Sequence, residues 1–219
     1  MTLQAGSSKP KASMRETRSC VRRFAMRLGQ SSMALAILAR ETKRSRLLSL
    51  GTPIANRPDP VRVAEEMAWL DVLSGGRLEM GLVKGAPYEI APANSNPANL
   101  MRRYWEAHDL ILKAMSTTDG PFNWEGEFFH YRNVNIWPRP YQQPTPPVWM
   151  TGLSVETGRM AAERGHVVGT LLSLSAAGPM FEAYHPSGGR SQITHPITIV
   201  LAPMHPTVLL RSHRWSPSP

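Results

Sequence analysis

The stretch "DPVRVAEEMAWLDVLSGGRLEMGLVKG", residues 59–85, decides the fold of this 219-residue chain. Asp59 is a residue type that caps helices, and Pro60 suits the first helical position. The apolar residues that follow recur at helical spacing and are Val63, Met67, Leu70 and Leu73. Residues 74–76 then stop the helix, and residues 77–85 have the pattern of a buried strand. The stretch therefore predicts a helix that leads directly into a strand.

The same alternation of helix and strand continues on both sides of this stretch. The expected strands are residues 45–55, 77–85, 146–152 and 166–174, and the other expected helices are residues 34–44, 99–116 and 155–165. Strands that alternate with helices indicate parallel βαβ units and an α/β fold. An open doubly wound sheet and a closed (β/α)₈ barrel both satisfy this spacing.

Residues 122–140 interrupt the alternation. Their aromatic side chains alternate with polar ones, which predicts a two-stranded hairpin with its turn near Glu125-Gly126. The aromatics lie near Arg132 and Arg139, as they would in a base-stacking platform. The Pro-rich connector that follows favours the simpler interpretation that they pack on the outside of the fold.

The net charge of +9 is concentrated at the N-terminus. Residues 1–46 hold eleven Lys and Arg against two Glu, whereas residues 47–219 hold fourteen charges of each sign. A neutral body argues against a nucleic-acid partner. The apolar stretch Met33–Ala39 is far shorter than a membrane span, so we expect no membrane partner. Cys20 is the single cysteine, which excludes an internal disulfide and fits a reducing, cytoplasmic location.

Two segments carry a specific resemblance. "AEEMAWLDVLSGGRLEMGLVKG" (residues 64–85) and "RPYQQPTPPVW" (residues 139–149) resemble signature segments of the bacterial luciferase-like flavin-dependent monooxygenases. The resemblance runs from about Ala34 to Leu174 and implies a (β/α)₈ TIM barrel. The four expected strands are similar to the third through sixth strands of that barrel, so we expect a partial barrel.

The barrel implied by the resemblance divides the chain into three parts. We expect residues 1–33 to be a basic, poorly ordered segment, residues 34–185 the luciferase-like barrel portion, and residues 186–219 a divergent tail rich in Pro and His. Barrels of this kind need about 250 residues. We therefore expect a truncated or frame-disrupted member of the family.

The resemblance also implies an activity. It predicts a monooxygenase that uses reduced FMN and O₂ to oxygenate a small organic substrate, with a flavin reductase as partner and, if the barrel is complete, a homo-oligomeric state. An oxidoreductase that transfers hydride from a deazaflavin coenzyme is an alternative with the same fold. A non-catalytic, truncated remnant is a second alternative.

The resemblance places the cofactor at the carboxyl ends of the strands, where barrel active sites lie. Lys84 and Gly85 end one strand, and Lys84 occupies a position where the family usually has arginine to hold the flavin phosphate. Lysine keeps the charge but loses the bidentate geometry of arginine. Without the resemblance, Lys84 would be an ordinary surface lysine. Thr52 begins the segment 52–56, which in the family passes beneath the isoalloxazine ring.

A second phosphate site is implied at "TGLSVETG", residues 151–158. Gly152 follows a strand, and Ser154 and Thr157 match family positions that contact the phosphate. A helix N-terminus stabilises an anion through its unpaired N–H groups and its dipole. Ser154 would also cap this helix, and capping is compatible with binding. The catalytic acid or base is left unassigned.

The histidines indicate no metal site. His108 lies within a predicted helix and is interpreted as a helix-face residue rather than a base, and His130 and His166 have no partner at metal-ligand spacing. The zincin, serine-hydrolase and P-loop motifs do not occur in the sequence.

Overall fold

The computed structural model describes residues 31–85, 96–170 and 172–185. Its helices are α2 (Ser31–Glu41), α3 (Pro60–Ser74), α5 (Leu100–Ser116), α6 (Val155–Glu163) and α7 (Leu174–Tyr184). Its strands are β1 (Leu47–Pro53), β2 (Leu78–Val83), β3 (Phe122–Glu125), β4 (His130–Val134), β5 (Val148–Thr151) and β6 (Val167–Gly169). Two short 3₁₀ helices, η1 (Ile54–Asn56) and η2 (Pro97–Asn99), precede α3 and α5. Because α2 begins at Ser31, residues 31–33 are helical rather than part of the expected N-terminal segment. Residues 1–30 and the tail from residue 186 lie outside the described residues.

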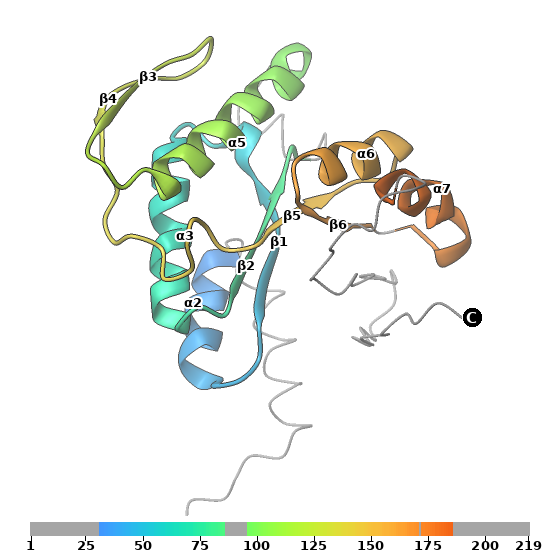
Figure 1. Ribbon diagram of the computed structural model, residues 1–219, viewed down its shortest axis with the longest axis horizontal. Helices are drawn as coiled ribbons and strands as arrows, with labels where there is room; N and C mark the ends of the chain where they lie inside the picture. The colour runs from blue at the N-terminus through green and yellow to red at the C-terminus, as the bar shows by residue number, and fades with distance from the viewer. Residues whose placement is uncertain (1–30, 86–95, 171, 186–219) are drawn as a thin grey trace, which may run out of the picture.

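Four strands form one parallel sheet in the order β1-β2-β5-β6 (Figure 1). The chain passes from β2 to the neighbouring β5 through α5 and the separate antiparallel hairpin β3-β4. The parallel arrangement and the hairpin confirm the alternation expected from the sequence.

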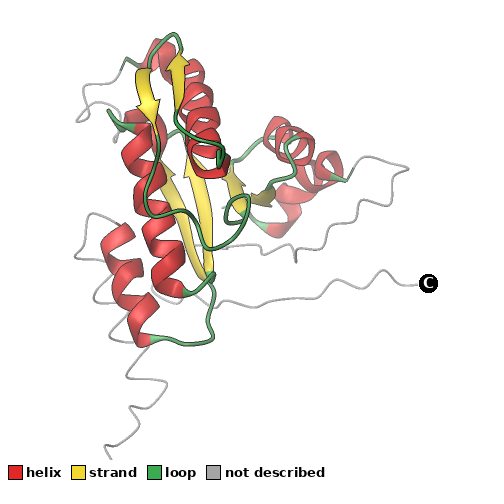
Figure 2. Cartoon of the chain, turned by 60° about the vertical axis from the view of Figure 1, so that its left-hand side comes forward, coloured by secondary structure: helices red, strands yellow, loops and turns green. Residues whose placement is uncertain are grey.

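One face of this sheet is covered by helices (Figure 2). The side chains of Leu78, Met80 and Leu82 are at most 1% exposed, whereas Glu79 and Val83 on the other face are partly exposed. A doubly wound sheet carries helices on both faces, while a barrel wall carries them only outside. The described sheet therefore has the arrangement of a segment of barrel wall.

Helix α3 follows the expected design with one difference. Asp59 Oδ1 accepts the N–H of Arg62 at 3.1 Å, and Gly75 closes the helix in the left-handed conformation with φ 64°. Leu73 was expected in the buried stripe but is 54% exposed. Asp71 and Ser74 occupy the inward positions near it because their polar groups have partners inside the fold.

Arg77 of the glycine-rich turn binds the end of α2. Its guanidinium donates to the backbone oxygens of Ala39 and Ser45 at 2.8 Å, of Thr42 at 3.1 Å and of Ser74 at 2.7 Å. Carbonyls at a helix C-terminus lack intrahelical partners. Arg77 therefore joins α2 to the turn between α3 and β2.

Asp71 joins the two signature segments. Its carboxylate is 0% exposed and accepts the backbone N–H of Gln142 at 2.7 Å and its side-chain N–H at 2.8 Å. The Gln142 amide also donates to the Leu78 carbonyl at 2.8 Å. The segment 139–149 is thus held directly against α3 and β2.

Glu106 of α5 holds the β3-β4 hairpin. Its carboxylate accepts the backbone N–H groups of Glu127, Phe128 and Phe129 at 2.8–3.0 Å and the indole N–H of Trp124 at 3.2 Å. These bonds confirm the hairpin and fix its turn against the outer side of α5.

Two clusters of buried side chains form the core. The larger, called the N-terminal cluster, comes from α2, β1, η1, α3, β2, α5, the hairpin segment and Val148 of β5. The smaller, called the C-terminal cluster, consists of Met150, Ala161, Val168, Met180 and Tyr184. Trp105 packs against both clusters.

The last described elements differ from the sequence expectation. Strand β6 covers only Val167–Gly169 instead of residues 166–174, and α7 was not expected. Gly178 and Pro179 lie inside α7, and residues of these two types disfavour a helix interior. The helix forms because Met180 and Tyr184 are buried with side chains of α6 and β6, and Ala177 is buried as well.

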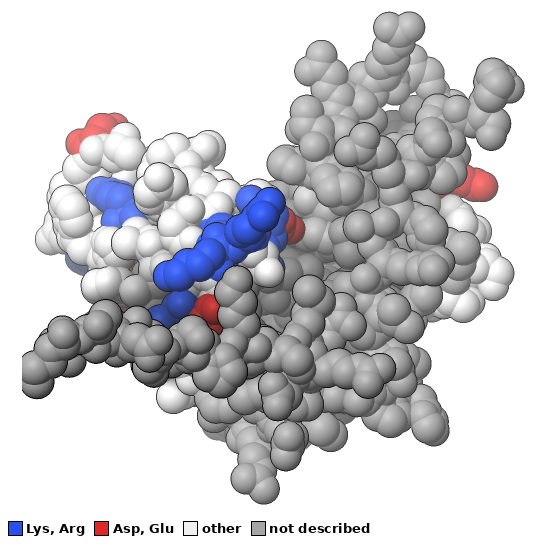
Figure 3. Space-filling model, turned by 90° about the horizontal axis from the view of Figure 1, so that it is seen from below, with Lys and Arg blue, Asp and Glu red and all other residues white. Residues whose placement is uncertain are grey.

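Several exposed charges on the described surface form ion pairs. Arg62 binds Glu65, Arg102 binds Glu127, and Arg159 binds Glu156. On the face seen in Figure 3, Lys and Arg side chains lie beside Asp and Glu side chains. Among the described helices, none has the length and apolar character that a membrane crossing requires.

Candidate functional site

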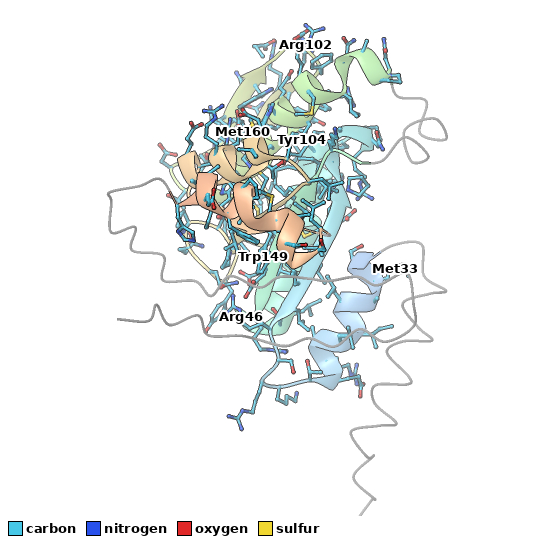
Figure 4. The ribbon with its side chains drawn as sticks, turned by 90° about the vertical axis from the view of Figure 1, so that its right-hand side faces the viewer. Met33, Arg46, Arg102, Tyr104, Trp149 and Met160 are labelled. Carbon is cyan, nitrogen blue, oxygen red and sulfur yellow. The ribbon has the colours of Figure 1, made fainter. Side chains whose placement is uncertain are left out.

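The carboxyl ends of three neighbouring strands lie level with one another. Pro53 of β1 pairs with Val83 of β2, and Leu82 of β2 pairs with Met150 of β5. Lys84 and Gly152 each lie one residue beyond these strands. The structure therefore brings the expected cofactor residues to a single edge of the sheet, the upper edge in Figure 1. In the view of Figure 4, Arg46, which precedes β1, marks the opposite end.

The N-terminus of α6 forms a compact turn at this edge. Ser154 Oγ accepts the N–H of Thr157 at 3.3 Å, and the two hydroxyl oxygens are 3.1 Å apart. A Cβ atom at Gly152 would collide with the Thr157 side chain. Glycine at this position therefore lets the strand end approach the first turn of α6, and an anion placed there would face the helix N-terminus. Gly152, Ser154 and Thr157 lie together as expected, and Ser154 is also the cap.

Buried polar atoms without partners lie at the same edge. Within the described residues, Thr151 Oγ1 and both side-chain amide atoms of Asn56 are buried and make no hydrogen bond. Asn56 belongs to η1, directly after β1, and Thr151 is the last residue of β5. A buried polar group without a partner is costly, so these atoms point to a group that binds here. The sequence pattern did not single out Thr151, because only burial reveals its missing partner.

Lys84 and Gly85 leave β2 at the exposed rim. Lys84 is exposed, and Gly85 has φ 94°, a conformation that side chains rarely adopt. In the described part of the chain no carboxylate lies within ion-pair distance of Lys84. None of the described carboxylates therefore competes with a phosphate for the Lys84 ammonium group at this edge.

Thr52 lies at the site but uses its hydroxyl group within the protein. Its side chain is 7% exposed, and Oγ1 is 3.0 Å from Ser49 Oγ. Arg103 fixes the following turn by donating to the carbonyls of Ala55 at 2.9 Å and Arg57 at 3.3 Å. Segment 52–56 therefore has a fixed backbone at the end of β1.

The donor set suits an organic anion. Hydroxyl groups, backbone N–H groups and an ammonium group all donate to phosphate oxygens. Among the described residues no group of three or more His, Cys, Asp or Glu could hold a metal ion. The site therefore fits the phosphate of a flavin-type cofactor by its chemistry.

Two histidines that the sequence analysis treated separately lie in direct contact. His108 was interpreted as a helix-face residue and His166 as lacking a partner, yet their Nε2 atoms are 2.9 Å apart in the interior. They are separated by 58 positions in sequence, so no local spacing could reveal the contact. His166 precedes β6 and thus lies at the amino ends of the strands, away from the candidate site.

A sequence profile described as "Luciferase-like monooxygenase" matches residues 13–205. The oxygenase component of a flavin-dependent trigonelline monooxygenase from Acinetobacter baylyi is 31% identical over 134 residues, which are 60% of this chain and 36% of that protein. The chain spans about half or less of the length of the curated relatives it matches.

Solved structures share the architecture. The oxygenating constituent of the 3,6-diketocamphane monooxygenase of Pseudomonas putida, in complex with FMN, matches 80% of this chain and 58% of its own, with a TM-score of 0.63 and 19% identity. The coenzyme F420 dependent tetrahydromethanopterin reductase of Methanopyrus kandleri matches 71% of this chain and 50% of its own, with a TM-score of 0.55 and 20% identity. These likenesses concern the fold and confirm that the parallel sheet is part of a (β/α)₈ barrel.

Proposed function

Because this chain belongs to the luciferase-like monooxygenase family, we propose that the protein is a flavin-dependent monooxygenase that uses reduced FMN and O₂. The substrate class that we propose is a small organic molecule. A trigonelline monooxygenase and an alkanal monooxygenase are among the relatives of this chain, which supports oxygenation of such a molecule. The trigonelline monooxygenase relative is an oxygenase component, which supports a separate flavin reductase as partner. A homo-oligomeric state and a cytoplasmic location complete the proposal.

The turn at the N-terminus of α6 is the observation that supports this proposal most directly. Gly152, Ser154 and Thr157 would hold the phosphate through the helix N-terminus and two hydroxyl groups. Lys84 would add a positive charge from the neighbouring strand end. Thr52 and Gly85 would shape the edge through their backbone, since the Thr52 hydroxyl group is already engaged.

Reduced flavin, when bound, would supply the electrons for the reaction with O₂, and the described residues would bind and orient it. The helix N-terminus would stabilise the phosphate dianion through its unpaired N–H groups and its dipole. Thr151 Oγ1, which has no partner within the described residues, can donate a hydrogen bond to a bound ligand. These groups would bind and position the cofactor, which would carry out the oxidation chemistry.

A deazaflavin-dependent oxidoreductase is the second candidate. The F420-dependent reductase shares the fold, and a phosphate-binding turn at the N-terminus of α6 would suit either cofactor. The two candidates differ in the need for oxygen. Hydride transfer from a reduced deazaflavin proceeds under anaerobic conditions, whereas oxygenation requires O₂, so anaerobic turnover with each cofactor distinguishes them.

Replacement of Lys84 tests the proposed phosphate site. Lys84→Met should weaken FMN binding by up to about fivefold, because an exposed ion pair contributes up to about 1 kcal/mol, and should leave riboflavin binding unchanged. Flavin fluorescence titration with both ligands measures the two affinities.

The matched control is Lys43→Met. Lys43 is exposed in the connection between α2 and β1, at the opposite end of the sheet. Equal FMN affinities of the two variants would contradict the placement of the phosphate beside Lys84. If the unaltered chain retains no FMN and shows no substrate-dependent O₂ uptake with a flavin reductase, the non-catalytic remnant is the correct reading.

A further inference from the structure

The contact between His108 and His166, called here the histidine pair, is buried in the interior. The two side chains are 1% and 7% exposed, and their Nε2 atoms are 2.9 Å apart. His108 Nδ1 lies 2.9 Å from Asp109 Oδ1. The pair joins the middle of α5 to the residue that enters β6.

The hydrogen-bond chemistry of the pair allows only one proton in the contact. A carboxylate only accepts, so His108 Nδ1 carries a proton and donates it to Asp109. Between the two Nε2 atoms, one nitrogen donates and the other accepts. If both rings were positively charged, each Nε2 would carry a proton, and two N–H groups would face each other at 2.9 Å.

The surroundings of the pair oppose a second positive charge. Arg164, in the turn before β6, donates to Asp109 Oδ1 at 2.9 Å, and its guanidinium lies 4.1 Å from the Trp105 ring. Burial, the charge of His108 and that of Arg164 lower the pKa of His166 to about 4, and Asp109 alone acts in the opposite direction.

Two phenols complete the environment and stay neutral. The Tyr184 hydroxyl group of α7 donates to the His166 carbonyl at 2.9 Å, and the Tyr104 ring of α5 lies 6.1 Å from the His108 ring. Burial raises the pKa of Tyr104 to about 12 and also raises that of Tyr184. Neither group can therefore offset an added proton.

The pair lies where the two core clusters meet. Tyr184 belongs to the C-terminal cluster, and Trp105, whose ring lies 5.4 Å from His108, packs against both clusters. We propose that the histidine pair is an acid-sensitive contact that holds the C-terminal cluster against α5 and releases it when a second proton enters the pair. The α6 N-terminus belongs to the released part, so acid would also loosen one wall of the candidate site.

The direction of the pH dependence follows from the two states of His166. An unfolded or opened histidine has a pKa near 6.5, whereas the closed state binds the proton only near pH 4. Between pH 4 and pH 6.5, the opened state binds the proton and the closed state does not, so protons favour opening of the contact. The equilibrium constant for opening of the α6-β6-α7 part should increase about 30-fold from pH 7.5 to pH 5.

Hydrogen exchange of the full chain tests this proposal. Exchange rates of residues 155–184, corrected for the intrinsic pH dependence of amide exchange, should rise about 30-fold at pH 5 relative to α3. His166→Gln keeps a hydrogen-bonding amide but removes the titration, so this rise should disappear. His130→Gln, at an exposed position on β4, should keep it.

Imidazole NMR of the unaltered chain provides a test that does not depend on how a variant folds. The resonances that disappear in His166→Gln should report a neutral ring down to about pH 5 while the chain is folded. A His166 that titrates near 6.5 in the closed state, or equal pH-dependent exchange in His166→Gln and the unaltered chain, would overturn the proposal.

Discussion

A single buried carboxylate, that of Asp71, connects segments that are far apart in sequence. Both of its oxygens accept hydrogen bonds, one from the backbone and one from the side chain of Gln142. The carboxylate is fully enclosed, so its hydration is replaced by these two bonds. The contribution of Asp71 to the stability of the fold therefore depends on its two acceptor oxygens.

Asp71→Asn should destabilise the protein by about 2 kcal/mol. The asparagine amide would turn one acceptor into a donor, so that one Gln142 N–H would face another N–H group in the interior. Urea unfolding at pH 7.5 measures the loss. The exposed Asp119→Asn serves as control and should change the free energy of unfolding by less than about 0.5 kcal/mol. Similar values for both variants would show that the Asp71–Gln142 bonds contribute nothing.

At the scale of elements, the β3-β4 hairpin depends on one side chain of the helix beneath it. Glu106 accepts three successive backbone N–H groups of the turn. These groups have no partners in a strand, so the carboxylate takes the place of a strand partner. The hairpin is thereby attached to α5 at its turn.

Glu106→Gln should loosen the turn of the hairpin without unfolding the barrel portion. The glutamine side chain would place an NH₂ donor among the three backbone N–H groups and the indole N–H that Glu106 now accepts. Amide exchange at residues 127–129 should accelerate about tenfold or more, corresponding to the loss of a charge-assisted bond of about 1.5–3 kcal/mol. Exchange in α6 should remain unchanged. Glu163→Gln removes an exposed carboxylate that pairs with Arg159, and it should leave both regions unaffected. Equal acceleration in both regions would contradict a local role.

The elements also show what sequence alone can predict. Helix α3 and the start of α6 were predictable because Asp59, Pro60, Gly75 and Ser154 are local signals. Helix α7 was not predictable, because its Gly and Pro oppose a helix and contacts with α6 and β6 stabilise it. The candidate site followed from strand ends and family motifs. The unpartnered Thr151 hydroxyl group and the histidine pair did not, because burial and contacts between distant residues carry no local pattern.

At the scale of the whole described structure, two core clusters share one sheet. The β2-β5 pairing continues the sheet between them, and Trp105 packs against both from the helical side. The indole also lies against the Arg164 guanidinium. Cooperative unfolding thus depends on a few side chains at this boundary.

Trp105→Ala should reduce the cooperativity of unfolding. Loss of a partly buried indole at the boundary should cost about 2–3 kcal/mol and should separate the transitions of the two clusters. Calorimetry at pH 7.5 checks this, because the ratio of van't Hoff to calorimetric enthalpy should fall below 1. Trp69→Ala, at a position that is 52% exposed on α3, is the control and should keep the ratio of the unaltered chain. A narrow single transition in Trp105→Ala would contradict the expectation.

Arg77 has a consequence for how relatives are selected for study. A cation in a glycine-rich turn is a typical ligand-binding residue. The Arg77 guanidinium, however, donates its hydrogen bonds to backbone carbonyls of α2 and the neighbouring turns. Selection for folding alone would preserve it, as it would preserve Asp71 and Gln142. Family members that have lost catalytic activity can therefore retain the signature segments. A survey for active members should be ranked by the residue at the Thr151 position, whose hydroxyl group has no hydrogen-bond partner within the described residues, and by the residue at the exposed Lys84 position.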